Sequence, residues 1–234
     1  TGTNRPLQHF DAISPKIGFV YRTTPTSQLY FNASRAYEAP LNLELLSSVN
    51  ANGTPNTGFL NLDAQRAWQL ELGHRGMSAD KRYSWDVTVY NLEMQKEILA
   101  SIINNQGTFQ NANGTRHTGV EAGGGMVLGK GLFAQGGAGR EDSLQTRAAY
   151  TWSRFKFTDN VFAGSGANQV VIARDCNTVA GAPEHSLNVE ARYDHPAGWW
   201  IAPNIEWSMS GFYTDYLNTI KNPSYVVVNL RSGY

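Results

Sequence analysis

Hydrophobic residues recur at every second position through most of the chain, which is the pattern of β-strands with one apolar and one polar face. Trp85, Val87 and Val89, for example, alternate with polar side chains. Stretches with helical spacing are few. The alternation predicts nine strands: Lys16–Arg22, Ser27–Ser34, Arg66–Arg75, Ser84–Tyr90, Thr118–Leu128, Ser143–Phe157, Ser186–Tyr193, Trp199–Ser208 and Tyr225–Tyr234.

The connections between these strands alternate in length. The short ones are Thr23–Thr26, Met77–Arg82 and Asp194–Gly198. The longer ones are Tyr37–Gln65, Ala100–Asn113 and Thr158–Pro183, and two of intermediate length are Gly129–Asp142 and Thr214–Pro223. Short turns at one end and long loops at the other are typical of outer-membrane β-barrels, whose strands of about 9–11 residues cross the bilayer at a tilt.

Two strands carry an irregularity. After Val89 the apolar positions change phase to Leu92 and Met94, which a β-bulge near Tyr90–Asn91 would explain. The alternative is that the strand has already left the membrane at this point. Pro203 cannot donate a ladder hydrogen bond, so we expect a local distortion there.

The aromatic residues favour a membrane barrel over a soluble β-sandwich or propeller. Tryptophan and tyrosine recur near strand ends, where amphipathic rings form two girdles at the headgroup level. The expected girdle residues are Tyr21, Trp68, Trp85, Trp152, Tyr193, Trp199, Trp207 and Tyr234. No repeat of 40–50 residues is present, which weakens the propeller interpretation. The polar residues on the other face would line a wet lumen.

Composition and charge exclude several functions. The 19 lysine and arginine residues balance the 19 aspartate and glutamate residues, so the chain has no basic excess, which argues against a nucleic-acid partner. The single cysteine, Cys176, excludes an intrachain disulfide, and it would pair outside this segment or be incidental. The five histidines show no metal-ligand spacing and no nucleophile elbow is present, so we expect no metal, no cofactor and no enzyme activity. A hydrolase with acids on its loops is the remaining enzymatic alternative.

Six motifs together resemble the β-barrel of TonB-dependent outer-membrane receptors across essentially the whole chain. They are SRAYEAP (Ser34–Pro40), LDAQRAWQLELGHRG (Leu62–Gly76), WDVTVYNLEMQKEIL (Trp85–Leu99), GTRHTGVEAG (Gly114–Gly123), GAPEHSLNVEARYDHPAGWW (Gly181–Trp200) and YVVVNLRSGY (Tyr225–Tyr234). No single motif is specific, but their order and spacing are. Within the family, the ferric citrate receptors are the subgroup that the chain resembles.

The resemblance implies an all-β fold: an antiparallel transmembrane barrel of 22 strands, of which this chain would supply about nine, without the plug domain and the final strands. It also implies active uptake of a scarce, bulky nutrient across the bacterial outer membrane. The expected cargo is a ferric siderophore or another iron chelate. The expected partners are the TonB complex, reached through the N-terminal region, and outer-membrane lipid with lipopolysaccharide. The alternatives are a passive porin-like channel and a receptor for a cofactor without iron, such as cobalamin.

Glu71 and Glu121 are the lumen carboxylates to which the resemblance assigns a role. Both have inward-facing parity, in the motifs LELG and GVEAG, on strands that are two strands apart. Carboxylates at these motif positions pair with plug arginines in the family. The alternative is that they are ordinary solvated carboxylates of the lumen. Gly123–Gly125 would give room for close packing against a plug.

Five basic residues near long loops are candidates for contact with an anionic chelate. Arg116 and His117 lie at the outer end of one strand, and Arg35, Arg174 and His185 are similarly close to loops. Those that face outward would instead form an ordinary polar rim or contact lipopolysaccharide phosphates.

Overall fold

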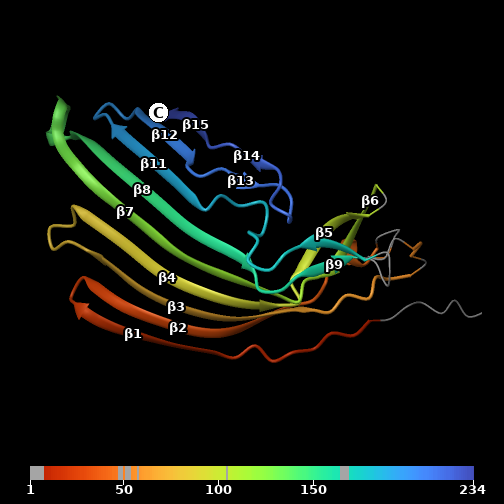
Figure 1. Cartoon of the computed structure of the whole chain (residues 1–234). Coiled ribbons are helices and arrows are strands. Elements are labelled where there is room, and N and C mark those ends of the chain that lie inside the picture. The colour runs from red at the N-terminus through yellow and green to blue at the C-terminus, as the bar shows by residue number, and fades with distance from the viewer. Residues whose placement is uncertain (1–7, 47–49, 51–53, 57, 104, 164–168) are drawn as a thin grey trace, which may run out of the picture.

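A computed structural model describes residues 8–46, 50, 54–56, 58–103, 105–163 and 169–234. Its main feature is one curved antiparallel sheet of nine strands, in which each strand pairs with the sheet strand that precedes or follows it along the chain (Figure 1). The strands are, in sheet order, β1 (Lys16–Thr24), β2 (Ser27–Glu38), β3 (Gln65–Met77), β4 (Tyr83–Gln95), β7 (Gly114–Gln135), β8 (Glu141–Phe157), β11 (His185–Asp194), β12 (Trp200–Ser208) and β15 (Tyr225–Gly233). All nine predicted strands are therefore confirmed.

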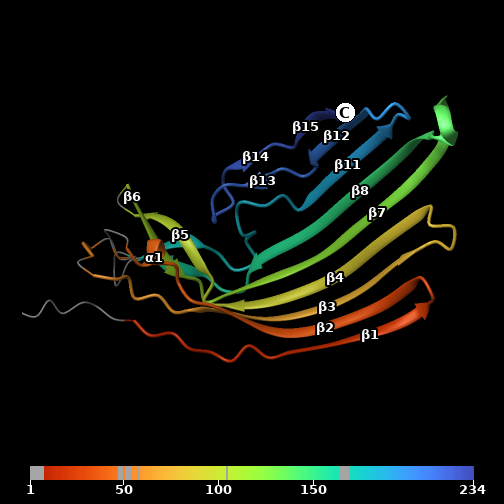
Figure 2. The same cartoon turned by 180° about the vertical axis from the view of Figure 1, so that it is seen from behind.

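The connections also follow the predicted asymmetry. Tight turns join the strands at one end of the sheet, and the long loops gather at the other end (Figures 1 and 2). The intermediate connection Gly129–Asp142 lies at the tight-turn end. The strands β7 and β8 continue into this segment and pair there as a hairpin, which contains the 3-10 turn η1 (Gly137–Gly139). The long-loop end carries α1 (Asn42–Leu45) and three small hairpins: β5 (Ile98–Ile103) with β6 (Gln106–Asn111), β9 (Val161–Ala163) with β10 (Val170–Ala173), and β13 (Phe212–Tyr213) with β14 (Lys221–Asn222).

The predicted bulge near Tyr90–Asn91 is wrong. The register of β4 runs without interruption against both β3 and β7, so the side chains keep strict alternation through this segment. Asn91 therefore shares a face with Val89, and Leu92 lies on the opposite face. The polar residue on the outer side and the apolar residue on the inner side indicate that β4 leaves the lipid at this point, which was the alternative explanation.

Pro203 produces a small defect. The β11–β12 ladder lacks pairs between Glu190↔Asn204 and Tyr193↔Ile201, directly beside the proline, while the register on both sides is the same. On its other edge Pro203 pairs normally with Leu230 of β15. Because proline has no amide hydrogen, strand pairing is lost locally, but the register of the strand does not shift.

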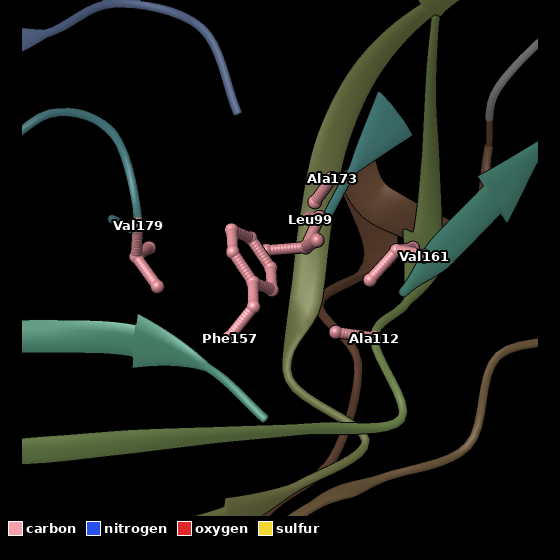
Figure 3. Close-up of a cluster of buried hydrophobic side chains, with 6 residues drawn as sticks. All are labelled: Leu99, Ala112, Phe157, Val161, Ala173 and Val179. Carbon is pink, nitrogen blue, oxygen red and sulfur yellow. The ribbon is translucent and has the colours of Figure 1, made fainter. Parts of the chain in front are cut away.

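Buried hydrophobic side chains gather under the long loops rather than along the sheet. One cluster consists of Leu99, Ala112, Phe157, Val161, Ala173 and Val179 (Figure 3). A second joins Leu45, Leu60 and Leu62. The sheet itself exposes large hydrophobic residues on its outer face, such as Val228 at 70% and Leu230 at 66%. Such a face requires an apolar solvent, and the loops need a core of their own because they extend into water. Within the described residues, no helix is long and apolar enough to cross a membrane.

Candidate functional site: the inner face of the sheet

The inner face of the sheet is polar and carries a groove of about 580 Å³ whose lining includes Tyr30, Glu71, Asp86, Thr88 and Glu121. These residues belong to β2, β3, β4 and β7, and the strand register brings them together. In a barrel this face would line the lumen. Three of the five residues are carboxylic acids, so the groove is strongly acidic.

Tyr30 spans the groove because a glycine makes room for its ring. It pairs directly with Gly73 on the next strand, where any Cβ would overlap the tyrosine ring. The ring crosses β3 at this point, and its hydroxyl lies 3.0 Å from the Asp86 carboxylate and 2.5 Å from the Thr88 hydroxyl on β4. Tyr30 thereby holds Asp86 in position beside the two glutamates.

Glu71 and Glu121 face the same groove. Glu71 pairs with Tyr90 on β4, and Glu121 pairs with Thr88 two residues farther along that strand. This register puts the two positions roughly 12 Å apart, from two strand spacings and a two-residue offset. Glu71 accepts hydrogen bonds from the amides of Asn32 and Gln69. Among the described residues, neither glutamate takes part in a salt bridge.

Toward the tight turns the inner face becomes basic. Arg192 contacts the Asp194 carboxylate at 2.7 Å and stacks over Trp200, and Arg231 pairs with Glu190. Arg147 lies between them and the acidic groove, and no ion pair of the described residues includes it. The inner face is thus acidic toward the long loops and rich in arginine toward the turns.

The predicted basic candidates Arg116 and His117 point to opposite faces. Arg116 lies outside, 2.5 Å from Glu93, and its side chain is 57% exposed. His117 lies inside, stacked on Phe155 at 4.3 Å between ring centroids, with Nε2 3.3 Å from the Glu97 carboxylate. Burial of Glu97 opposes its ionisation, but the His117 ring and the Thr115 hydroxyl outweigh that effect, so the Glu97 pKa is lowered.

The other three candidates lie apart from the groove. Arg35 is on the outer face, with its guanidinium 6.0 Å from the Trp68 ring centroid. His185 is also outside, and its Nδ1 lies 2.7 Å from the Tyr150 hydroxyl. Arg174 is exposed in the loop after β10. Of the five candidates, His117 alone shares the inner face with the acidic groove, and contact with a chelate remains a prediction for all of them.

The expected girdle residues lie at the two ends of the strands. Trp68, Trp152 and Trp207 lie toward the long loops, and Tyr21, Trp85, Tyr193, Trp199 and Tyr234 lie toward the tight turns. At the turn end, Tyr193 and Trp199 pack together at 5.5 Å, and Phe133 joins them edge-on to Tyr193 at 5.9 Å. Phe133 was not predicted, because its segment reads as a glycine-rich connection.

Asp86 is the main residue of the groove that the sequence did not lead us to single out. Asp86 occupies an inward-facing position in the alternation of its strand, as Glu71 and Glu121 do in theirs. This pattern could have identified it. Cys176 is exposed in a loop with φ of 64° and carries no disulfide. Within the described part of the chain, no three histidine, cysteine or acidic side chains gather as metal ligands would.

Comparison with known proteins agrees with this architecture. The copper transporter OprC superposes with a TM-score of 0.67 at 15% identity, over 94% of this chain and 31% of that one. The siderophore receptor PiuA from Acinetobacter baumannii gives 0.67 at 17% identity, over 93% and 28%. The ferric yersiniabactin uptake receptor FyuA from Yersinia pestis gives 0.64 at 17% identity, over 94% and 29%. This chain thus spans less than a third of each structure, and at these identities the likeness concerns the fold.

The family model "TonB dependent receptor-like, beta-barrel" matches residues 1–234. The match covers the entire chain and agrees with the polar inner face, the apolar outer face and the separation of turns from loops. The chain therefore belongs to the β-barrel family of TonB-dependent receptors, which are proteins of the bacterial outer membrane.

Proposed function

We propose that this chain forms part of the wall of an active outer-membrane receptor that takes up a ferric siderophore or another iron chelate with energy from TonB. The observation that carries the proposal is the acidic groove of the inner face, where Glu71, Asp86 and Glu121 meet and none of them forms an ion pair among the described residues. Arg75 is the cross-strand partner of Asp86, but its guanidinium lies over the Tyr30 ring, 5.4 Å from the ring centroid. Carboxylates without an ion-pair partner on a lumen wall favour an occupant that brings positive charge.

The proposed occupant of the groove is a plug domain whose arginines pair with Glu71 and Glu121. Arginine forms bidentate contacts with carboxylates, so two such pairs would fix both the position and the orientation of the plug. Gly123, whose Cβ would meet only Ala148 at 3.9 Å, leaves the wall flat beside the groove and supports close approach of the plug. Arg147 is the complementary anchor, because it faces the same lumen and would pair with a plug carboxylate.

The test of transport uses the full-length receptor in a strain that lacks it. We expect TonB-dependent uptake of at least one labelled ferric chelate from a panel that also contains copper and cobalamin. Uptake that persists without TonB would support a passive channel instead. Uptake of cobalamin or copper alone would show that the cargo is not an iron chelate. The panel includes copper because the similar structures comprise both siderophore receptors and a copper transporter.

The test of plug pairing is the double variant Glu71→Gln with Glu121→Gln. Loss of one partner of a buried ion pair costs about 3–5 kcal/mol, and less in a wet lumen, so the plug should loosen and large antibiotics should enter the cell. Glu206→Gln is the matched control, since Glu206 lies on the inner face outside the groove, where it accepts a hydrogen bond from Asn229 at 3.1 Å. Equal antibiotic sensitivity of the double variant and the control would contradict the pairing.

A further inference from the structure

The outer face of the sheet has charged side chains at its long-loop end and none through its middle. The register aligns Arg35, Trp68, Glu93, Arg116 and Lys156 in one row across five strands. Arg66 lies one position above this row on β3, and Arg154 one position below it on β8. We call Arg35, Arg66, Arg116, Arg154 and Lys156 the outer cationic patch.

The patch lies directly above the lipid-facing band. Below the row of Arg116, the next outer row toward the turns has Arg154 as its one charged member, beside Ala33, Leu70, Asn91 and Thr118. The row after it is Phe31, Leu72, Val89, Val120 and Trp152, and it contains no charged residue. Leu72 and Val89 are each 50% exposed, as expected of side chains that face lipid. The positive charges therefore begin where the hydrocarbon ends, at the depth of the lipid headgroups on the long-loop side.

The positive charge of the patch is only partly neutralised by the protein. Glu93 binds Arg116, and Glu184 at the margin accepts a hydrogen bond from Trp152 at 3.3 Å. Lys156 donates to the Thr178 hydroxyl at 2.8 Å, which holds its ammonium group without cancelling its charge. Arg66 and Arg154 are exposed, and neither forms an ion pair among the described residues. An excess of cations thus remains on this wall in a chain of zero net charge.

We propose that the outer cationic patch binds the phosphate groups of lipopolysaccharide, the anionic lipid of the outer leaflet. Guanidinium groups bind phosphate in a bidentate manner, and several of them on adjacent strands match a headgroup that carries more than one phosphate. The proposal rests on the outer-membrane location of the family and not on the transported cargo. A receptor without measurable uptake would leave it intact.

The experiment uses the full-length receptor in detergent and measures binding of purified bisphosphorylated lipid A by native mass spectrometry. The variant is Arg116→Gln with Arg154→Gln, and the matched control is Lys130→Gln with Arg140→Gln at the exposed turn end of the same two strands. Loss of a charge-assisted contact should weaken binding about tenfold or more, and the control should bind like the natural protein. Binding by the natural protein should also weaken as salt is added.

Three results would overturn the proposal. The first is equal lipid A binding by the double variant and the control. The second is equal binding of lipid A from which both phosphates have been removed, because the contact would then be apolar. The third is equal affinity for phosphatidylglycerol, which would make the patch a general anionic-lipid surface. Heat-dependent migration on gels verifies barrel assembly. If the pair variant fails to assemble, the single variant Arg154→Gln and the salt titration decide.

Discussion

Replacing Val189 by arginine tests the membrane orientation of the sheet most directly. Val189 lies on the outer face of β11, between Ala148 and Ile205 on the neighbouring strands. The strand runs for ten residues from His185 to Asp194, so Val189 lies near its middle. With an apolar band about 25 Å tall, the middle of the strand is about 12 Å from either interface. An arginine at this position cannot reach the headgroups without thinning the bilayer.

The expected cost is about 2–4 kcal/mol, which lowers the folded-to-unfolded ratio about 30-fold to several hundred-fold. The structure also predicts a gradient with depth. Leu70 is also on the outer face, but it pairs with Asn91 and lies in the same row as Arg154 of the outer cationic patch. An arginine there can extend to the interface, so Leu70→Arg should cost only about 0–1 kcal/mol.

The assay is equilibrium unfolding of the full-length receptor in phospholipid vesicles by urea, followed by tryptophan fluorescence and gel migration. Asn188→Arg is the matched control, because Asn188 is adjacent in sequence, exposed and on the inner face. It should be nearly neutral. If Asn188→Arg or Leu70→Arg costs as much as Val189→Arg, then the assignment of the outer face to lipid is refuted.

Three further predictions concern the inner face, the loops and the topology. Gly119→Ala should destabilise the barrel by about 1–3 kcal/mol, because the new Cβ would overlap the Tyr90 ring and the next strand, whereas Gly123→Ala should leave barrel stability unchanged in urea unfolding. The lowered Glu97 pKa stabilises the folded loops above the ordinary glutamate pKa of about 4.5, and this stabilisation should be lost as pH falls through the lower folded value. Amide exchange in the β5–β6 hairpin should therefore accelerate in acid, and Glu97→Gln should remove that dependence. An epitope inserted between Ala79 and Asp80 should be labelled only after permeabilisation, and one at the tip of the β5–β6 hairpin on intact cells; the reverse would invert the topology.

The nine strands could be predicted because their two faces meet different surroundings. One face meets lipid and the other meets a wet lumen, so the two-residue period appears in the sequence without interruption. The β5–β6 hairpin was harder to predict. Its strand Ile98–Ile103 is mostly apolar instead of alternating, because it packs into the core under the loops through Leu99. The phase change at Leu92 arises in the same way, since apolar residues turn inward once the strand has left the lipid.

The candidate site could be predicted only as far as strand parity extends. Parity assigns Glu71, Asp86 and Glu121 to one face, and the register then brings them into one groove. The cluster of Glu97 with His117 depends on a loop that folds back over the end of β7. No spacing in the sequence encodes that return. The residue types alone did not separate a lumen-facing histidine from an outward-facing arginine at the next position.

The strand register itself is therefore part of the functional design. A shift of one residue in β7 would bring Arg116 into the apolar surroundings of Phe155 and turn His117 toward the lipid headgroups. The same shift would move Glu121 from the acidic groove to the lipid-facing band, where an unpaired charge is costly. Each of these three misplacements has a free-energy cost, and the three arise on different faces or at different depths, so together they disfavour the shifted register. Charge placement along this strand thus selects the register in which a lumen groove, a loop core and a headgroup surface can exist together.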